Sequence, residues 1–253
     1  MRTDGELGLV RKFERVAEID STNSELLRRI ERDGVDSVEG MLLVAQHQTG
    51  GRGRRERVWE SQSSGNLLCS LAVVPPFQRE FWGWLAQIVS LAVSDALMKA
   101  GAQNVKIKWP NDVMIASRKV AGILVESRAG NAEEIAVIGV GINVASHPEI
   151  TESEGMVSTS LNQEGLQDVD VEDVCVDYLC SLERWLKTTQ NGFEDCRREL
   201  TARSFILGRQ VRVTMDGEKI EGLAAGLSEA GALLVQSDGE EKAIISADRV
   251  RLL

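Results

Sequence analysis

The segment QTGGRGRRERVW, residues 48–59, carries the strongest candidates for chemistry in this chain. Four arginines, Arg52, Arg54, Arg55 and Arg57, lie within six positions, and the glycines between them let the backbone close tightly on a ligand. Such a segment repels itself, and ordering it costs about 1–2 kcal/mol per residue. We therefore expect it to order around an anion. The alternative, a solvated surface loop, is disfavoured by the apolar strand before it.

A second candidate is KWPNDV, in which Pro110 and an Asn-Asp pair separate two apolar segments. Lys108, Asn111 and Asp112 would then cluster at a strand end. A lysine suits a phosphate, and side-chain oxygens suit Mg²⁺. An ordinary β-turn is the alternative, because proline, asparagine and aspartate are common turn residues.

Two further segments, RKVAGILVES and GVGINV, combine apolar strands with glycines. Lys119 precedes the first strand, where Gly122 would let another group approach the backbone; a surface lysine at a strand start is the alternative. Gly139 and Gly141 weaken a buried strand unless a ligand packs there. The pattern is not GxGxxG and no helix follows it, so a Rossmann site is excluded.

Hydrophobic periodicity places these segments among alternating helices and strands. Strands are expected at residues 41–46, 66–74, 105–109, 112–115, 122–127 and 135–144, and helices at 21–33, 82–100, 171–188 and about 192–202. Thr22 and Glu25 are expected to form a capping box. From about residue 208, short strands alternate with Asp-Gly turns, which predicts a small β-barrel.

The composition is that of a globular protein, with 43% hydrophobic and 27% charged residues among 253. The net charge of −10 gives no long-range attraction for nucleic acid or anionic lipid. We find no signal peptide and no apolar run of about 18 residues. The four cysteines are interpreted as reduced core residues of a cytoplasmic protein. Neither histidine has a partner at zinc-ligand spacing.

Taken together, the four segments resemble the biotin–protein ligases, whose signatures are GRGRRGRxW, KWPND, K-hydrophobic-AGILVE and G-x-GIN. The resemblance spans about residues 13–253 and includes STN at 21–23, near the position where the family holds the ureido ring of biotin. It implies an α/β (α+β) fold, with a mixed-sheet catalytic domain at residues 1–204 and an SH3-like β-barrel at residues 205–253. The related lipoate ligases share the fold but lack the arginine-rich loop.

The resemblance also implies roles for individual residues. Biotin is expected to contact Ser21, Thr22, Asn23, Gln48, Gly51, Arg52, Arg54, Lys119, Gly122, Gly139 and Gly141. ATP is expected to contact Arg54, Arg57, Trp59, Lys108, Asn111, Lys119 and Asn143. The catalytic residues would be Lys119, Arg52 and Arg54, with Mg²⁺ near Asn111 and Asp112.

The implied reaction joins biotin to ATP, forming biotinyl-5′-AMP and pyrophosphate, and then transfers biotin to a lysine of a biotin carboxyl carrier protein. Neither a nucleic-acid nor a membrane partner is expected, and a homodimer is compatible with the resemblance. About 20 residues precede STN, too few for the DNA-binding domain of some members, so no repressor function is expected. Two alternatives are a lipoate or octanoate ligase on the same fold and an RNA-binding module that uses GRGRRER.

One departure from the family pattern is Glu56, which stands where the family usually has glycine. A carboxylate inside an anion site would repel the ligand. We therefore expect Glu56 to face away from the ligand and to pair with Arg55 or Arg57.

Overall fold

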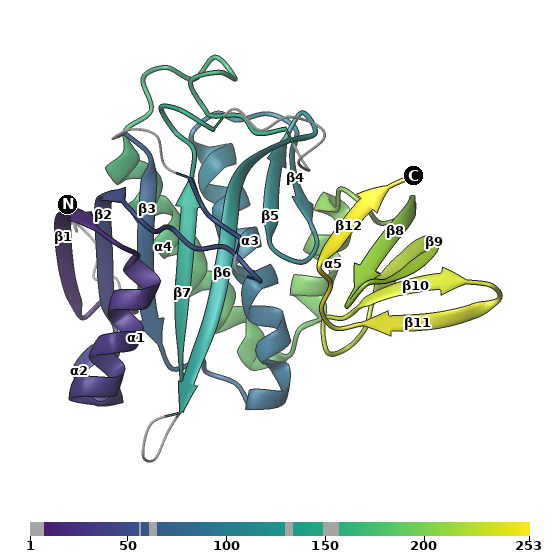
Figure 1. Cartoon of the computed structure of the whole chain (residues 1–253), viewed down its shortest axis with the longest axis horizontal. Coiled ribbons are helices and arrows are strands. Elements are labelled where there is room, and N and C mark those ends of the chain that lie inside the picture. Colours follow the sequence, from purple (N-terminus) through teal and green to yellow (C-terminus); the bar gives the residue numbers. More distant parts are fainter. Residues whose placement is uncertain (1–7, 56, 61–64, 130–133, 149–156) are drawn as a thin grey trace.

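The computed structural model describes residues 8–55, 57–60, 65–129, 134–148 and 157–253, which form two sheets and a set of helices (Figure 1). The helices are α1 (Thr22–Asp33), α2 (Val35–Val38), the 3-10 helix η1 (Arg79–Trp84), α3 (Leu85–Lys99), α4 (Val171–Thr188), the 3-10 helix η2 (Thr189–Asn191) and α5 (Glu194–Arg203). The strands are β1 (Lys12–Ile19), β2 (Met41–Gln48), β3 (Leu67–Val73), β4 (Val105–Lys108), β5 (Asp112–Ile115), β6 (Arg118–Ala129), β7 (Glu134–Ile142), β8 (Gln210–Met215), β9 (Glu218–Leu227), β10 (Leu233–Ser237), β11 (Glu240–Ile244) and β12 (Arg249–Leu252).

The larger sheet has seven strands in the order β1-β2-β3-β7-β6-β5-β4. β1 runs parallel to β2, and every other neighbouring pair is antiparallel, so the expected mixed sheet is confirmed. Strand β1 was not predicted, because its sequence KFERVAEI is largely exposed and lacks a clear apolar face. It is the edge strand beside β2.

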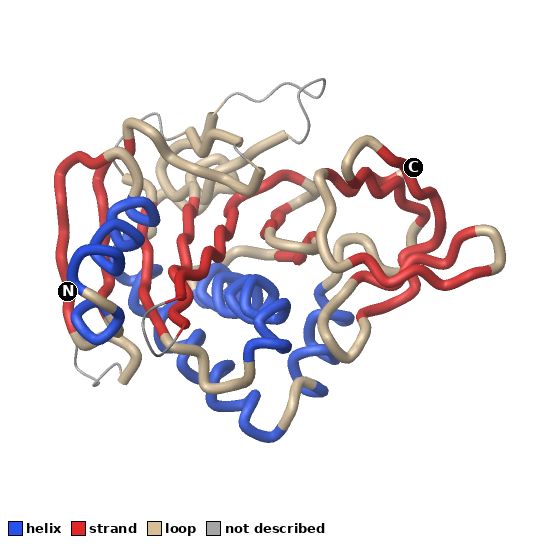
Figure 2. Tube along the Cα trace, turned by 60° about the horizontal axis from the view of Figure 1, so that its bottom comes forward, coloured by secondary structure: helices blue, strands red, loops and turns tan. Residues whose placement is uncertain are grey.

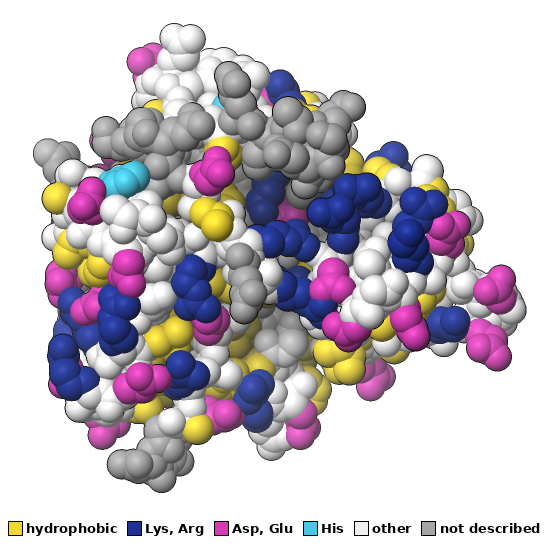
Figure 3. Space-filling model, viewed as in Figure 1, with side chains coloured by type: hydrophobic (Ala, Val, Ile, Leu, Met, Phe, Trp, Pro, Cys, Tyr) yellow, Lys and Arg dark blue, Asp and Glu magenta, His cyan; other side chains and the backbone are white. Residues whose placement is uncertain are grey.

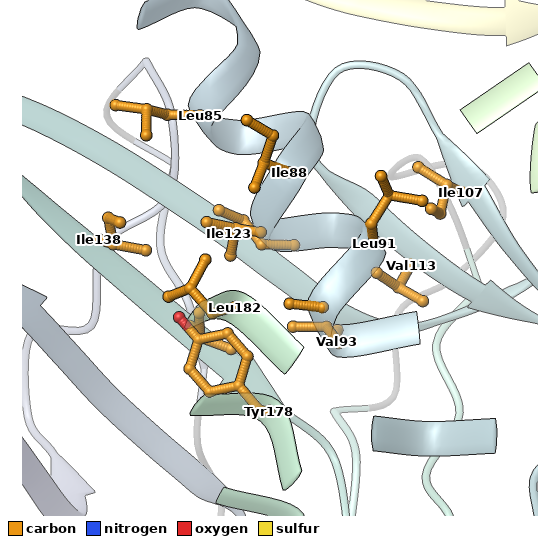
Figure 4. Packing of buried hydrophobic residues seen from close by; sticks show 14 of the residues in the cluster. Leu85, Ile88, Leu91, Val93, Ile107, Val113, Ile123, Ile138, Tyr178 and Leu182 are labelled. Carbon is orange, nitrogen blue, oxygen red and sulfur yellow. The ribbon is translucent and has the colours of Figure 1, made fainter. Parts of the chain in front are cut away.

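Helices α3 and α4 pack together on one face of this sheet, and Figure 2 shows the long helices gathered on one side of the strands. Helix α3 is buried around most of its circumference, since Gln87, Ser90 and Ser94 are enclosed together with its apolar residues. Figure 4 shows Ile88 and Leu91 of α3 packing near Ile123 and Ile138 of the sheet. This side of the sheet is the main hydrophobic core.

Within the described part of the chain, one helical stretch, Arg79–Lys99, is long and apolar enough to span a membrane by length and composition. In the structure, however, 72% of its 18-residue window is buried inside the protein. The stretch therefore occupies the position of a core helix.

Helix α1 covers the opposite face of the sheet, over β2, β3 and β7. Its N-cap is Ser21, whose side-chain oxygen accepts from the backbone N–H of Ser24. The prediction that Thr22 caps this helix is therefore wrong by one residue. Thr22 is instead the first helical residue, and its side chain points to β2 and β3.

The C-terminal region forms a separate five-stranded antiparallel sheet in the order β11-β10-β9-β8-β12, beside the β4 edge of the large sheet (Figure 1). The two Asp-Gly turns are confirmed, with positive φ at Asp216, Gly217, Asp238 and Gly239. Strand β12, RVRL, was not predicted. The structure describes every residue of this sheet, and its two end strands, β11 and β12, are not paired with each other. Closure of the sheet into a barrel therefore stays a prediction.

The prediction that all four cysteines are core residues is wrong for one of them. All four are free, as expected, and three are buried, but Cys180 is exposed. Cys180 lies five residues after Cys175 on α4, and five residues turn a helix by more than one full turn. Cys175 therefore faces the core and Cys180 faces solvent.

Candidate active site

A cavity of about 410 Å³ opens between the α1 side of the large sheet and the C-terminal sheet. Its walls come from the start of α1, the end of β2, the β4–β5 turn, the middle of β6 and the end of β7. The segment that follows β2, within residues 49–59 and called the glycine-arginine loop below, forms a further wall. The last wall is β12 with the residues before it. The four segments singled out in the sequence therefore converge on one site.

One end of the cavity is neutral and polar. Oε1 of Gln48 accepts from the backbone N–H of Thr22 at 2.8 Å and lies 3.1 Å from its hydroxyl. Ser21 and Thr22 are both buried. These contacts fix the Gln48 side chain against the first turn of α1, and the arrangement suits a small, uncharged polar group of a ligand.

A buried network lies behind this polar end. The hydroxyl of Ser70, on β3, lies 2.6 Å from both Thr22 Oγ1 and Asn23 Oδ1. The amide nitrogen of Asn23 donates to Glu126 at 3.0 Å. Glu126, on β6, also accepts from Arg52 at 2.9 Å. A continuous set of polar contacts thus links β3, α1 and β6 to the start of the loop.

The glycines form a flat wall that side chains already cover closely. A Cβ atom added to Gly139 would lie 2.3 Å from Asn23 Oδ1, and one added to Gly141 would lie 2.5 Å from the indole ring of Trp59. At Gly122 an added Cβ would lie 2.7 Å from the same ring. A side chain at any of these three positions would therefore force Asn23 or Trp59 to move. At Gly122 another group, the Trp59 ring, does approach the backbone, as the sequence predicts. The packing of a ligand on Gly139 and Gly141 stays a prediction.

The opposite end of the cavity is cationic. Lys119 Nζ lies 2.5 Å from Asp112 Oδ1 and 5.4 Å from the centre of the Trp59 ring. Burial lowers the pKa of Lys108; the nearby Asp112 opposes this shift, whereas Lys119, Arg251 and Arg57 add to it. Positive charge is therefore concentrated here beyond what one carboxylate offsets.

Two asparagines flank these cations. The amide nitrogen of Asn111 donates to the carbonyl of Ile123 at 2.7 Å. That of Asn143 donates to the carbonyl of Thr159 at 3.0 Å, while Asn143 Oδ1 is buried and, among the described residues, has no hydrogen-bond partner. Asn143 itself lines the cavity, so an acceptor without a partner lies in its wall, beneath the surface.

The loop is fastened to the C-terminal sheet. Arg54 donates to Ser246 Oγ at 2.8 Å, Arg55 pairs with the Asp248 carboxylate, and Arg57 donates to the Asp248 carbonyl. Burial lowers the pKa of Arg54, and the charge of Arg55 adds to this shift. In Figure 3, lysine and arginine side chains gather where the body of the molecule meets the C-terminal sheet. The C-terminal region therefore completes the site.

Comparison with known proteins agrees with this geometry. The model of the biotin/lipoate A/B protein ligase family matches residues 17–143, and that of the biotin protein ligase C-terminal domain matches residues 206–248. The chain belongs to the biotin/lipoate A/B protein ligase family.

Relatives in this family resemble the chain over most of its length. It is 33% identical to the biotin–[acetyl-CoA-carboxylase] ligase of Mycobacterium tuberculosis over 96% of this chain and 90% of that protein. It is 32% identical to the bifunctional ligase/repressor BirA of Escherichia coli over 87% of this chain and 68% of that protein. The biotin protein ligase from Aquifex aeolicus, solved in complex with biotin and ATP, matches with a TM-score of 0.81 at 30% identity, over 96% of this chain and 100% of that chain.

The structure brings nearly all of the predicted site residues of this family member to the cavity. Gly51 is the exception: it is buried beside the loop, where its carbonyl accepts from the backbone N–H of Trp59 at 2.9 Å. An added Cβ at Gly51 would lie 2.3 Å from the Trp59 carbonyl oxygen, so this glycine closes the loop on itself. Glu56 lies outside the described residues.

Sequence reasoning missed Ser70, Glu126 and the cavity wall formed by residues 247–251. Ser70 is a buried polar residue within the apolar strand LLCSLAV, which is itself a signal of a partnered hydroxyl. Glu126 could have been found from strand alternation, since residues 122, 124 and 126 share one face of β6. The third group was missed because β12 was not predicted.

Proposed function

We propose that this chain is a biotin–protein ligase, which activates biotin with ATP to biotinyl-5′-AMP and transfers it to a lysine of a biotin carboxyl carrier protein. The observation that carries the proposal is the order of surfaces along one cavity. The neutral polar end at Gln48 suits the polar ring of biotin, and the flat glycine wall suits the apolar body of that ring system. The cationic end at Lys119 and Lys108 suits the place where the biotin carboxylate meets a phosphate of ATP. The names of the relatives support it.

In the first step, a biotin carboxylate oxygen attacks the α-phosphorus of ATP. A bond forms between that oxygen and the phosphorus, and the bond to the oxygen bridging the α- and β-phosphates breaks, so that pyrophosphate leaves with its electron pair. Two anions must meet, and cations placed in advance offset their repulsion. We assign this role to Lys119, Arg52 and Arg54. Asp112 holds the Lys119 ammonium in place at 2.5 Å.

In the second step, the amine of the acceptor lysine attacks the carbonyl carbon of the mixed anhydride. An amide bond forms, the bond between the acyl carbon and the phosphate oxygen breaks, and AMP leaves. The chain needs no nucleophile of its own for this. Asp112, beside the reacting end of the cavity, is our candidate to accept a proton from the amine.

The remaining residues are assigned as the resemblance implies. We assign the polar ring of biotin to Ser21, Thr22, Asn23 and Gln48, and its body to Gly122, Gly139 and Gly141. We assign Gly51 to the cap over biotin together with Arg52 and Arg54, where its backbone closes the loop. We assign ATP to Arg54, Arg57, Trp59, Lys108, Asn111, Lys119 and Asn143. We expect Asn23 to support the polar ring of biotin from behind, because Ser70 and Glu126 already bond its side-chain amide.

The oxygen donors present fit a Mg²⁺ ion that arrives with ATP. Among the described residues, no three of His, Cys, Asp and Glu group together as a metal site. Asp112 and Asn143 do line the cavity, however, and Asn143 Oδ1 is buried without a hydrogen-bond partner among the described residues. Mg²⁺ is usually held by one or two carboxylates together with substrate phosphates. We propose that Asp112, with Asn111 or Asn143, holds the ion, which would neutralise phosphate charge.

We further propose that residues 1–204 form the catalytic domain and residues 205–253 the C-terminal domain. The two separate sheets and the matches at residues 17–143 and 206–248 support this division. A cytoplasmic location and a carrier domain as the macromolecular partner follow from the same proposal. Neither a nucleic acid nor a membrane is among the proposed partners. A homodimer is compatible with the proposed function.

The test is biotin-dependent exchange of labelled pyrophosphate into ATP by the full chain, without any acceptor protein. We expect exchange with biotin and far less with lipoate. Equal exchange with lipoate would indicate the lipoate branch of the family, and no exchange with either acid would contradict the proposal. Filter binding to RNA at increasing salt concentrations tests the alternative of an RNA-binding module.

A further inference from the structure

A chain of buried polar groups lies behind the neutral polar end of the cavity, and two of its members, Ser70 and Glu126, have no role of their own so far. Thr22, Asn23 and Ser70 are each exposed by 4% or less. Among the described residues that line the cavity, neither Ser70 nor Glu126 occurs. Each buried donor needs an acceptor, so the direction of every hydrogen bond in such a chain follows from its ends.

The direction is fixed at one end by Arg52. A guanidinium only donates, and Arg52 donates to the two carboxylate oxygens of Glu126 at 2.9 and 3.2 Å. Both oxygens therefore accept, and the group of Asn23 that faces them at 3.0 Å must be its amide nitrogen. The carbonyl of Leu124, 3.3 Å from the same nitrogen, requires the same orientation. The side-chain oxygen of Asn23 is thereby left for Ser70.

This orientation sets the next two hydrogen bonds. Asn23 Oδ1 can only accept, so the Ser70 hydroxyl donates its single proton to it across 2.6 Å. Ser70 has no second proton, so its oxygen must accept from the Thr22 hydroxyl, also at 2.6 Å. Oε1 of Gln48, 3.1 Å from that hydroxyl, is the more distant partner for the same proton. With either partner the Thr22 proton is used inside the protein, and the Thr22 oxygen keeps only lone pairs.

We propose that Ser70 and Glu126 are positioning residues for substrate specificity, which hold the Thr22 oxygen as an acceptor so that the cavity selects a ring bearing an N–H donor. The inference rests on the proposed biotin ligase function and on Thr22 lining the cavity. The cyclic urea of biotin supplies ring N–H groups. The same ring with oxygen in place of N–H would bring two acceptors together, and a dithiolane such as that of lipoate would leave the acceptor unpaired.

The experiment measures, by calorimetry on the full chain, the Kd for biotin and for its two cyclic carbamate analogues, in each of which one ring N–H is replaced by oxygen. Discrimination is the Kd of the more weakly bound analogue divided by the Kd of biotin. We expect at least roughly a hundredfold in the wild type, because a built acceptor loses its donor. In Ser70→Ala the Thr22 proton keeps only its 3.1 Å partner and can turn to the analogue. Discrimination should then fall to about tenfold.

A double-mutant cycle tests whether Ser70 acts through Thr22. In a Thr22→Val background the hydroxyl that Ser70 controls is gone, so Ser70→Ala should change discrimination by less than about twofold. The matched control is Ser90→Ala, which removes another fully buried serine hydroxyl, one that donates to the Ala86 carbonyl at 2.8 Å within α3. It should leave discrimination at the wild-type level.

Two variants of Glu126 separate hydrogen-bond direction from charge. Glu126→Gln removes the charge that pairs with Arg52 but keeps one acceptor oxygen for Asn23, so it should weaken biotin and analogue alike and preserve discrimination. Glu126→Ala leaves Asn23 with the Leu124 carbonyl alone and should lower discrimination about threefold or more. Glu126 is only partly buried, so this pair decides the matter if thermal melting shows that Ser70→Ala does not fold.

The inference is overturned by wild-type discrimination in folded Ser70→Ala, or by an equal fall in the Thr22→Val background. It is also overturned if Glu126→Gln loses as much discrimination as Glu126→Ala, because Glu126 would then act through its charge on Arg52. A wild-type chain that neither binds biotin nor catalyses biotin-dependent exchange would instead contradict the proposed function, so the two failures are distinguishable.

Discussion

The two faces of strand β7 differ in what they bury. On the core side, Ile138, Val140 and Ile142 pack with the α3–α4 layer. Figure 4 shows Ile138 in this layer. On the other side, Ile135 and Val137 pack beneath α1, but the next two residues on that face are Gly139 and Gly141. The same face therefore changes from apolar packing to a glycine wall half-way along one strand.

This difference shows where the protein gives up stability for a binding site. Burying a large aliphatic side chain contributes about 1.5–3 kcal/mol, whereas a glycine inside a strand contributes no side-chain packing and weakens the strand. The glycine wall can be tolerated because the opposite face of the sheet is densely packed. Substitutions on the core face should change stability, and substitutions on the site face should change binding or catalysis.

The largest expected effect is on the site face, from Lys119→Ala. Asp112 would lose its 2.5 Å partner, and the meeting of carboxylate and phosphate would lose its cation. Breaking such a contact costs about 2–5 kcal/mol, so adenylate formation should slow roughly 30-fold to several-thousand-fold. Single-turnover kinetics measures this step, and calorimetry should show a much smaller loss of biotin affinity.

Lys242→Ala, at an exposed position on β11, is the control and should leave both quantities unchanged. Equal losses of rate and affinity in Lys119→Ala would mean that Lys119 binds substrate and transition state alike. Its proposed role would then be wrong.

On the core face, Ile138→Ala should mainly affect folding. Ile138 is fully buried, and removing a buried aliphatic side chain costs about 2–5 kcal/mol of unfolding free energy. Denaturant titration measures this loss, with Ile245→Ala, 83% exposed, as a control that should stay near wild type. The folded fraction of Ile138→Ala should bind biotin normally; a large loss of affinity there would argue against a division of labour between the faces.

These two faces also differ in how well the sequence predicts them. The core face follows from apolar periodicity, which located α3, α4 and most strands of the large sheet. Motifs located the glycine wall and Lys119. Neither signal reports long-range partners: Ser70 and Glu126 meet Asn23 only because β3, β6 and α1 converge in space. Strands β1 and β12 were missed because each is rich in charged residues and lies at a sheet edge.

A smaller effect is expected from Gly139→Ala, which places one methyl group on the site face. That methyl would lie 2.3 Å from Asn23 Oδ1, so the Asn23 side chain must move and its contacts with Ser70 and Glu126 must change. Overpacking of this kind costs about 1–3 kcal/mol. If the whole cost falls on the binding free energy, biotin affinity drops by roughly 5- to 150-fold. Calorimetry measures the affinity.

Gly226→Ala on β9 is the matched control, because the nearest atom to its added Cβ is Leu234 Cδ1 at 4.0 Å. It should change neither biotin affinity nor stability by much. If Gly139→Ala lowers stability while its folded fraction keeps full affinity, Asn23 does not shape the ligand site.

The last effect concerns a half-buried charge in the helix layer, Asp95 on α3. Arg203 and Arg184 bond its carboxylate at 2.5 and 2.6 Å, and Ser181 and Trp185 donate to it as well. Burial alone would raise the pKa of Asp95, but the hydrogen bonds from Ser181, Arg203 and Trp185 and the charge of Arg203 hold the pKa below 3.8. This charge is therefore satisfied by four side chains of α4 and α5.

The sign of the pH dependence follows from that lowered pKa. The stability contributed by the Asp95 carboxylate is present above its unfolded pKa, near 4, and is lost as the pH falls through the lower folded pKa. Asp95→Asn should therefore lower the unfolding free energy by about 1–3 kcal/mol at neutral pH. The gap to wild type should narrow below about pH 4. Denaturant titrations across pH measure the gap, with the exposed Asp36→Asn as control. A gap that stays constant into acid would show that Asp95 contributes through packing rather than through its charge.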